Sequence, residues 1–284
     1  MTSARTVTLI GSDGTRHVLA CSDEPYQLSM RAQLHGTAPY SLGTRRVGLI
    51  PGERLDTVQA LPRTLVVPLR VEGLTELAVD QAMGALGSIL SPRSDVRILY
   101  RRPDGVEREL TARYAGGGDA VSAFDEAGYL QHWCTVPLIF KALWPYWRDP
   151  SASTATHGPE TFNDGRSAGS NLVTVTNAGD VEVWPEITVT GYAEGIEAMS
   201  LTTGQVWRCR RILTVTDELR IDTDPRSFGV YINGAADYTA MDSLSEFWPL
   251  EPGANVLLFR GNTATGTESI GDFEVRWRPQ WETP

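Results

Sequence analysis

Alternating apolar and polar positions run through most of the chain and predict short strands joined by tight turns. The segment VTLIGSDGTRHVLA holds two apolar runs around Asp13-Gly14, and Asp-Gly between alternating residues is a strong hairpin signal. The same pattern returns over residues 96–114, around Asp104-Gly105. The first half of the chain is therefore expected to be rich in β-hairpins.

One helix interrupts this pattern, over residues 75–90. Its apolar positions recur at helical spacing, and Pro92 ends the run. Thr75 suits the N-cap because its hydroxyl can accept from free backbone N–H groups, and Glu76 places a carboxylate at the positive end of the helix dipole. We expect one face of this helix to pack on a sheet.

Residues 149–170 lack periodicity and are rich in Ser, Thr, Gly and Pro, which predicts a linker or an arm. From residue 172 onward, seven short apolar runs bounded by turn residues predict a β-sandwich. The predicted fold class is mainly β: an N-terminal β-rich α+β domain with one helix over residues 1–148, then a sandwich over residues 171–284.

Composition and charge narrow the class of protein. The 284 residues carry a net charge of −10, with 35 acidic and 25 basic side chains. Residues 1–150 contain 16 of each sign, so the remaining 19 acidic and 9 basic residues place the whole excess in the second half. Without a basic cluster the chain is not expected to bind nucleic acid, because phosphates are neutralised by grouped Lys and Arg.

Membrane and disulfide signals are weak. The sequence has no apolar run of the roughly 18 residues that a membrane span needs, and its first residues do not resemble a secretory signal, so we expect no membrane insertion and synthesis in the cytoplasm. Cys21, Cys134 and Cys209 are odd in number and widely spaced. They are expected to be buried thiols rather than a disulfide framework or a zinc site.

The sequence offers little catalytic chemistry. His17, His35, His132 and His157 are isolated, and no serine-hydrolase, phosphate-loop or zinc-protease motif is present. We therefore expect no enzymatic activity, no catalytic residue, no cofactor and no bound metal.

Three pairs of carboxylates were considered as the acid and base of a glycosidase, a hydrolase of host envelope polymer being one alternative function: Asp222 with Asp224, Glu182 with Glu186, and Asp242 with Glu246. Neighbours in sequence rarely have the separation that such a pair needs, so turn caps and solvated strand faces are the favoured interpretation. Asp222 and Asp224 also supply too few ligands for a calcium loop.

Tryptophan gives the second alternative. Five of the eight tryptophans lie in the second half: Trp184, Trp207, Trp248, Trp277 and Trp281. Aromatic rings exposed on a sandwich can stack on sugars, which would make this half a carbohydrate-binding module that contacts the host surface. Core packing is the commoner role of tryptophan, and binding of a host glycan has no motif behind it.

A series of motifs, taken in order, resembles one family. The segments VPLIFKALWPYW, NAGDVEVWPEITVTG, LTTGQVW, ELRIDTDP, SEFWPLEPGANVLLF and VRWRPQW are similar to segments of the distal tail proteins of long, non-contractile phage tails, including minor tail proteins of phages that infect high-GC actinobacteria. The resemblance covers most of the chain and is strongest from residue 131 onward.

The resemblance implies a structural virion protein of the tail tip. Its N-terminal domain would form a homohexameric ring, and a galectin-like C-terminal sandwich would project outward from that ring. The ring would join the tail tube protein to the tail-tip or baseplate hub, beside the tape-measure protein. DNA would pass through the lumen without specific binding. The galectin label describes shape alone, because Trp207 lacks the Gly and Glu that follow it in sugar-binding galectins.

In such a sandwich, eight residues are expected to set turns and packing rather than to touch a substrate: Asn177, Gly179, Trp184, Pro185, Asp222, Pro252, Gly253 and Asn255. A turn from Asn177 to Asp180, with Gly179 at positive φ, would set a hairpin; Trp184 would supply a large apolar contact. Pro185 would begin a strand, where its missing N–H does no harm. Gly253 would take positive φ, and Asn255 would bond to local backbone.

The ring contacts are expected on the strands of residues 1–20, 64–72 and 95–114, because unpaired strand edges there would otherwise invite uncontrolled pairing. Arg101 and Arg102 are the candidate interface residues. A second hypothesis concerns the lumen: the near-neutral first half would avoid retaining DNA, since a strongly basic bore would bind the passing phosphates.

Overall fold

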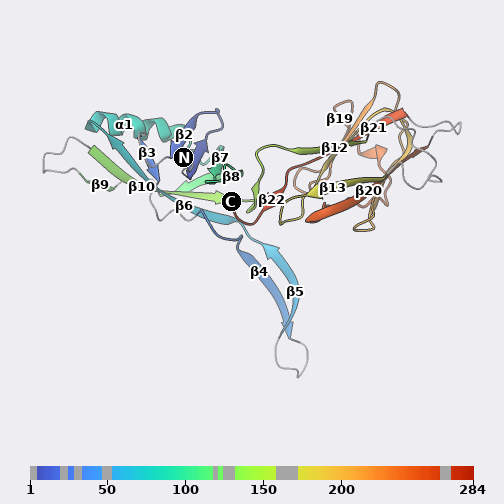
Figure 1. Ribbon diagram of the computed structural model, residues 1–284, viewed down its shortest axis with the longest axis horizontal. Helices are drawn as coiled ribbons and strands as arrows, with labels where there is room; N and C mark the ends of the chain where they lie inside the picture. The colour runs from blue at the N-terminus through green and yellow to red at the C-terminus, as the bar shows by residue number, and fades with distance from the viewer. Residues whose placement is uncertain are drawn as a thin grey trace. The chain divides into compact units, whose positions relative to one another are not determined.

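The chain folds into two compact units, each described here by itself. The computed structural model describes residues 5–19, 25–28, 34–46, 53–117, 121–123, 132–157, 172–262 and 270–284. The first unit comprises Met1–Pro150 together with Trp281–Pro284, and the second comprises Ser151–Gln280 (Figure 1). The second unit is thus an insertion near the end of the first. The structure confirms the predicted mainly β fold class.

The first unit is built on one antiparallel sheet whose strands run in the order β2-β1-β7-β8-β10-β6-β3, with β9, β11 and β22 attached to it. Its strands are β1 (Thr6–Ile10), β2 (Arg16–Leu19), β3 (Tyr26–Leu28), β6 (Arg63–Gly73), β7 (Asp95–Arg101), β8 (Glu107–Gly116), β9 (Val121–Ala123), β10 (His132–Ala142), β11 (Trp147–Arg148) and β22 (Gln280–Trp281). The two predicted turns are present, because β1 pairs with β2 and β7 pairs with β8. Gly14 and Gly105 adopt the positive φ that such turns require.

The helix begins where the sequence predicts and ends earlier. Helix α1 spans Glu76–Ala85, and the Thr75 side chain accepts a hydrogen bond from the backbone N–H of Ala78 at 3.2 Å. The chain then tightens into the 3-10 turn η1 (Leu86–Ser88). Leu86 and Ile89 stay fully buried there, so the apolar spacing reflects core packing beyond the end of the α-helix.

Alternation along the strands builds the core of the first unit. On β6 and β7 every second side chain is buried. These side chains meet those of β10 and the inner face of α1, which packs on β6 and β10. A single face of the sheet therefore supplies the core, as period-two patterning requires.

Two further strands of the first unit form a separate hairpin, which we call the arm. Its strands are β4 (Tyr40–Arg46) and β5 (Glu53–Ala60), paired only with each other among the described residues. In Figure 1 the arm extends away from the sheet of its own unit. The sequence analysis made no prediction for these residues.

The second unit is a sandwich of two antiparallel sheets. One sheet has the order β12-β21-β14-β17-β18-β19 and the other β13-β20-β15-β16. The strands are β12 (Ser153–His157), β13 (Leu172–Asn177), β14 (Glu186–Tyr192), β15 (Glu194–Ser200), β16 (Val206–Cys209), β17 (Glu218–Asp222), β18 (Gly229–Ile232), β19 (Ala235–Ala236), β20 (Gly253–Asn262) and β21 (Ile270–Trp277), with a 3-10 turn η2 (Tyr238–Ala240).

Large aromatic side chains fill the space between the two sheets. Trp207 and Trp248 are completely buried, and the stacked rings of Phe259 and Phe273 lie 4.4 Å apart between β20 and β21. Phe259 and Phe273 come from opposite sheets, so this pair joins the two layers. Burial of such side chains is the largest favourable term available to the sandwich.

Two boundaries differ from the prediction. Residues 153–157 were expected in a linker but form β12, which pairs with β21 in the sandwich. Residues 281–284 were expected in the sandwich but belong to the first unit, where β22 pairs with β11. Both segments are short and polar or irregular in sequence, so their strand pairing depends on partners far along the chain. Residues 158–171, the rest of the expected linker, lie outside the described residues.

Candidate functional site

The arm has one apolar face, and that face is exposed. Strand pairing places Tyr40 opposite Ala60, Leu42 opposite Val58, and, after a bulge, Thr44 opposite Leu55. These side chains therefore share one side of the hairpin. Leu42, Leu55 and Val58 are 61%, 52% and 54% exposed. No described residue of the chain covers this face.

The opposite face of the arm is polar. It carries Ser41 opposite Gln59 and Arg45 opposite Arg54. Asp56, the extra residue at the bulge, forms ion pairs with Arg45 at 3.4 Å and with Arg54 at 3.9 Å, which offsets the repulsion between the two facing arginines. The arm is thus a two-stranded ribbon with one polar face and one face that is apolar from Tyr40 to Leu55. The charged pair Arg46 and Glu53 follows on the apolar side, at the end away from Tyr40.

The last residues of the chain hold the root of the arm. We call Trp281 and Glu282 the C-terminal clasp. The Glu282 carboxylate accepts hydrogen bonds from the backbone N–H of Ala38 at 3.0 Å and from the hydroxyl of Tyr40. Its backbone oxygen accepts from Nη2 of Arg63 at 2.6 Å. The clasp therefore contacts the chain on both sides of the arm.

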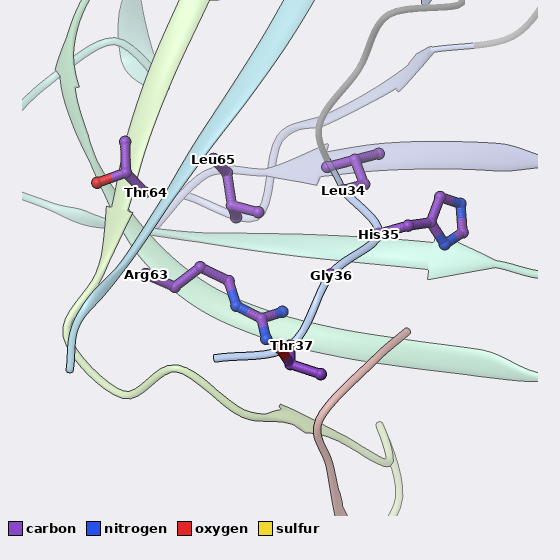
Figure 2. Close-up of a pocket in the computed structure, with 7 residues that line it drawn as sticks. All are labelled: Leu34, His35, Gly36, Thr37, Arg63, Thr64 and Leu65. Carbon is purple, nitrogen blue, oxygen red and sulfur yellow. The ribbon is translucent and has the colours of Figure 1, made fainter. Parts of the chain in front are cut away.

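Arg63 is also part of a small pocket, of about 140 Å³, formed by residues 34–37 and 63–65. Figure 2 shows its guanidinium beside Thr37, with His35 pointing away from it. His35 is engaged elsewhere, since its ring nitrogen lies 3.2 Å from the hydroxyl of Tyr100. The pocket brings together no nucleophile and base, and its chemistry is that of a buried cation.

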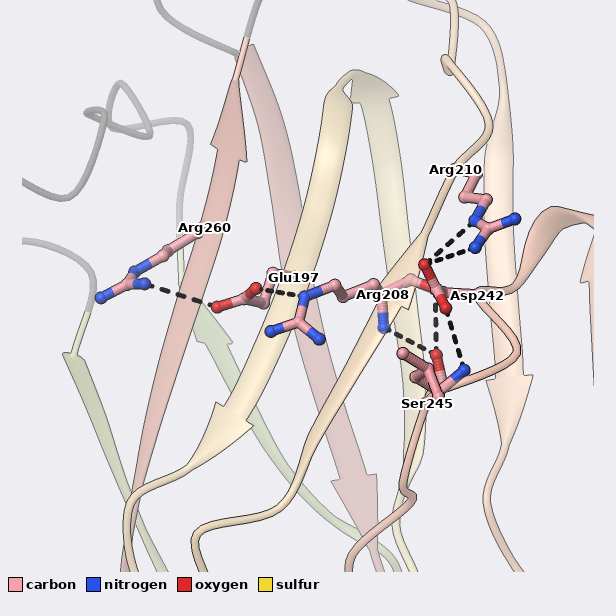
Figure 3. Close-up of polar contacts among 7 residues, drawn as sticks. Glu197, Arg208, Arg210, Asp242, Ser245 and Arg260 are labelled. Atoms are coloured by element: carbon pink, nitrogen blue, oxygen red, sulfur yellow. Dashed lines mark hydrogen bonds and ion pairs between the residues drawn. The ribbon is translucent and has the colours of Figure 1, made fainter.

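The outer face of the β13-β20-β15-β16 sheet is covered by a row of ion pairs (Figure 3). Glu197 lies between Arg208, at 2.7 Å, and Arg260, at 3.4 Å. Beyond them Arg210 pairs with Asp242 at 2.8 Å. Each carboxylate in this row already has an arginine partner, and hydrogen bonds from the Leu244 backbone and Arg210 lower the pKa of Asp242. The row is a structural surface.

The turn after Asn177 connects the two sheets and does not set the hairpin that was predicted. β13 ends at Asn177 and pairs with β20, whereas β14 pairs with β17 and β21 in the other sheet. The Asn177 amide is buried and donates to the carbonyls of Val181, at 2.9 Å, and Leu250, at 3.1 Å. It therefore fixes a crossover between layers.

Glycine is required at position 179 for a different reason from the one predicted. It does not adopt positive φ. A Cβ at this position would lie 2.2 Å from the backbone oxygen of Gln280, so only glycine allows the two backbones to approach. The Gly179 N–H donates to the Asn177 side chain at 3.0 Å, which adds to the same crossover.

Trp184 and Pro185 lie just before β14 and differ in their burial and contacts. Trp184 is half-buried and lies outside the buried core of the sandwich; the large apolar contact expected of it stays a prediction. Pro185 directly precedes β14, as predicted, and its carbonyl accepts from the Thr223 hydroxyl at 2.6 Å. Asp222 ends β17 and accepts from the Ser227 hydroxyl at 2.7 Å.

The turn before β20 has the predicted chemistry. Pro252 is exposed and Gly253 has a φ of 94°, which glycine alone adopts freely. Asn255 is fully buried; its side chain accepts from the Glu251 N–H at 2.9 Å and donates to the Glu251 carbonyl at 2.7 Å. These residues hold a turn and reach no surface site.

Arg101 and Arg102 lie at the end of β7, and both are exposed. Arg102 pairs with Asp104 across the turn at 2.9 Å. The strands of residues 1–20, 64–72 and 95–114 were chosen for free edges, and among them β2, within residues 1–20, does lie at an edge of the sheet. β6 and β7 are interior strands of the sheet, and its edges are β2 and β3. The arm offers the larger unpartnered surface.

Candidate catalytic residues do not converge in the described part of the chain. No three His, Cys, Asp or Glu side chains gather there to hold a metal ion. Cys134 and Cys209 are buried thiols, as predicted, and burial raises the pKa of both; Cys21 lies outside the described residues. Within the described residues, no helix is long and apolar enough to cross a bilayer.

The predicted carboxylate pairs serve local structure. Glu186 pairs with Arg220 at 3.1 Å and Asp242 with Arg210. Asp224 pairs with Arg226, and its N–H donates to Asp222 at 3.1 Å. Partial burial, and then the charge of Glu251, raise the pKa of Glu182. These are the solvated faces and turns that the sequence favoured.

Tryptophan does not form a platform for sugars. Trp207 and Trp248 are fully buried in the sandwich and Trp277 is nearly so, while Trp281 packs on the first unit. The premise of the carbohydrate-binding alternative was exposed indole rings on the second unit. The structure places three of the five indoles in its core.

The apolar face of the arm and the clasp were not predicted from the sequence. A signal was present in β4, where Tyr40, Leu42 and Thr44 alternate with polar or small residues. In β5 the bulge at Asp56 breaks the alternation between Leu55 and Val58, which hides the strand from a period-two search. Nothing in the last four residues indicates that they return to the first unit.

Comparison with known proteins finds a family whose model matches part of the chain. Residues 178–281 match the siphovirus-type tail component family, in its C-terminal domain. None of the curated proteins compared with the chain matches it.

Two solved structures share the fold over nearly the whole chain. The Dit protein of phage SPP1, described as a paradigm of the hub adsorption apparatus in phages that infect Gram-positive bacteria, has a TM-score of 0.67 and 17% identity over 96% of this chain and 98% of that chain. A chain of the phage P2 baseplate in its activated conformation with calcium has a TM-score of 0.50 and 11% identity over the same shares. At such identities the likeness concerns the fold.

Proposed function

We propose that this protein is a structural component of the tip of a long, non-contractile phage tail, because residues 178–281 match the siphovirus-type tail component family. It acts as the distal tail adaptor: six copies form a ring that joins the tail tube to the tail-tip hub, next to the tape-measure protein. The observation that carries this proposal is the family match over residues 178–281, supported by a fold shared with the SPP1 Dit protein over 96% of the chain. The residue motifs that resemble distal tail proteins agree with it.

The arm supplies a physical reason for assembly. A two-stranded hairpin is at best marginally stable in water, and this one exposes Leu42, Leu55 and Val58 on one side. Burying each of these side chains contributes on the order of 1–2 kcal/mol. A second copy of the chain is a partner that is present whenever the protein is made. In a closed ring every copy has the same contacts with its neighbours. We assign the apolar face of the arm to the contact between copies.

The work of such a protein is done by shape and interfaces. Of the carboxylates weighed for catalysis, Glu186, Asp224 and Asp242 pair with arginines, which fits a scaffold. The first 150 residues carry 16 charges of each sign, so a ring built from them would not retain DNA as a strongly basic bore would. DNA then passes through the lumen without specific binding, and the assembled protein resides in the virion.

The test is the mass of the purified protein by light scattering over a concentration series, followed by negative-stain imaging. We expect six-fold rings, formed by the protein alone or after addition of the tail-tube neighbour. A protein that stays monomeric in both conditions contradicts the proposal.

A matched pair of variants links the ring to the arm. Leu42→Glu and Gln59→Glu each add one negative charge to the same hairpin, on opposite faces. Leu42→Glu is expected to abolish ring formation, because a carboxylate would be buried at the contact. Gln59→Glu should assemble like the parent. If both variants form rings equally well, the apolar face of the arm is not part of the contact between copies. The ring proposal itself would then rest on the light-scattering test alone.

A further inference from the structure

The arm leaves its unit through a narrow root, and the clasp holds that root from the far end of the chain. The arm begins at Tyr40 and ends at Ala60, where the Leu61 N–H donates to the Pro39 carbonyl at 2.7 Å. Glu282 is about 240 residues away in sequence but bonds to Ala38 and Tyr40 on one side of this root, and to Arg63 on the other. One residue therefore joins both strands of the root.

A buried cation, Arg63, lies beside this contact. Arg63 is 5% exposed, and its Nε and Nη1 have no hydrogen-bond partner among the described residues. Burial lowers the pKa of Arg63, and the nearby negative charge of Glu282 opposes that effect. Removing the Glu282 side chain would take away this favourable charge, whereas the hydrogen bond from Nη2 of Arg63 to the Glu282 backbone oxygen would remain. The root of the arm thus contains a buried cation close to the Glu282 carboxylate.

The clasp is itself anchored independently of the arm. The Trp281 indole N–H donates to Asp149 at 3.3 Å, and the Arg108 guanidinium lies 4.0 Å above the Trp281 ring. Arg108 also pairs with Asp149, so the indole sits on an ion pair of the first unit. With Trp281 fixed in this way, Glu282 acts on the arm from a rigid base.

We infer that Glu282 is a positioning residue that orders the arm, so that the arm takes up its direction only when the C-terminal clasp is docked. Without the clasp, the arm is a two-stranded ribbon joined to its unit by two single connections, and such a ribbon frays. Since residues 281–284 follow the whole second unit in the chain, the arm becomes competent for contact after the entire protein has folded. This consequence for assembly rests on the proposed function, whereas the ordering of the arm does not.

The experiment measures amide hydrogen exchange across the first unit in the full-length chain carrying Leu42→Glu, which removes assembly as a variable. Adding Glu282→Ala should speed exchange in residues 41–46 and 53–60 about tenfold or more, because hydrogen bonds to a charged group are lost at the root. The β7 and β8 amides should keep their protection. Thr283→Ala, an exposed neighbour of the clasp, is the control and should leave the arm unchanged.

Arm amides that exchange at the parent rate in Glu282→Ala, with β7 and β8 intact, would overturn the inference. If Glu282→Ala instead loses amide protection throughout the first unit, the same measurement on Tyr40→Phe tests the inference. It keeps the ring and removes the hydroxyl contacts with Glu282 and, at 3.4 Å, with Tyr146, so we expect a rise of about threefold confined to the arm. An unchanged arm in that variant also overturns the inference.

Light scattering of Glu282→Ala in the otherwise unchanged chain separates this inference from the proposed function. A loosened arm in a protein whose parent forms no ring, alone or with the tail-tube neighbour, supports the clasp and contradicts the adaptor. Rings in the parent that persist in Glu282→Ala despite a loosened arm show that assembly does not need the clasp, which overturns the assembly half of the inference.

Discussion

Two hairpins of the first unit, β7–β8 and the arm, have the same antiparallel pairing and opposite surroundings. On β7 every second side chain, including Val96 and Ile98, is buried in the core of the unit. On the arm the alternating apolar side chains Leu42 and Val58 are more than half exposed. The alternation is the same kind of signal in both places. What differs is whether the unit itself provides a partner for the apolar face.

This comparison separates folding from assembly. An apolar face covered within the unit stabilises the monomer, and one left open contributes only when another molecule covers it. The arm keeps its two strands together with the Arg45–Asp56–Arg54 group on its polar face and with the clasp at its root. Its apolar face is then free for a contact between copies.

The largest expected effect tests the two apolar faces directly. Ile98→Ala should lower the free energy of unfolding by about 2–5 kcal/mol, because it leaves a cavity in a packed core. Leu42→Ala should change it by less than about 0.5 kcal/mol, as expected for an exposed position in the monomer. Denaturant unfolding of monomeric protein gives both values. Similar losses would mean that the arm is packed against its own unit.

A buried polar residue extends the comparison to the second unit. Asn177→Ala should cost about 1–3 kcal/mol, because it leaves the carbonyls of Val181 and Leu250 without their donor. Thr176→Ala, at the exposed neighbouring position of β13, is the control and should be nearly neutral. Thermal unfolding followed by circular dichroism distinguishes the two. A neutral Asn177→Ala would show that the crossover is held by β13 and β14 alone.

The originally expected interface gives a smaller effect. Double charge reversal, Arg101→Glu with Arg102→Glu, should weaken the ring if the end of β7 reaches a neighbouring copy. The unfolding free energy should change little, since the ion pair of Arg102 with Asp104 is exposed and such pairs contribute about 0–1 kcal/mol. Sedimentation across a concentration series reports the assembly. Rings of unchanged stability would show that Arg101 and Arg102 do not contribute to the contact between copies. The arm would then remain the proposed interface.

The smallest effect concerns acid stability of the sandwich. Hydrogen bonds from Asn233 and from the backbone and hydroxyl of Thr214 lower the pKa of Asp217 from 3.8 to about 2. A carboxyl group with a lowered pKa in the folded state stabilises the protein above pH 3.8, and this contribution is lost as the pH falls toward 2. Asp217→Asn should therefore flatten the pH dependence of unfolding between about pH 4 and 2. A parent and variant with parallel acid curves would contradict this assignment.

Much of the fold could be predicted from local signals. The turns at Gly14 and Gly105 and the Thr75 cap follow from backbone chemistry within a few residues, and the structure has them. β15 was missed because its inward positions include Ala198 and Ser200, which give little hydrophobic signal. The α-helix was predicted five residues too long, because Leu86 and Ile89 remain apolar for the core after the α-helix has ended.

The candidate site was less predictable than the fold. Gly179 was correctly identified as a structural glycine, but the reason lies in the backbone of Gln280, a hundred residues later. Likewise the choice of Arg101 and Arg102 assumed free strand edges, and sheet order cannot be obtained from one strand at a time. The role of Glu282 depends on its three partners around the arm, which lie more than 200 residues away in sequence.

By itself, the sequence determined what each short segment can do: which residues alternate, where a turn needs glycine, where a helix begins, and that catalytic groups are scattered. Those properties depend on neighbours along the chain and on the chemistry of single side chains. The tertiary structure decided which apolar face finds a partner and which stays open, and it returned the last four residues to the first unit. Both depend on contacts between residues far apart in sequence, whose pairing is selected by the packing of the whole chain.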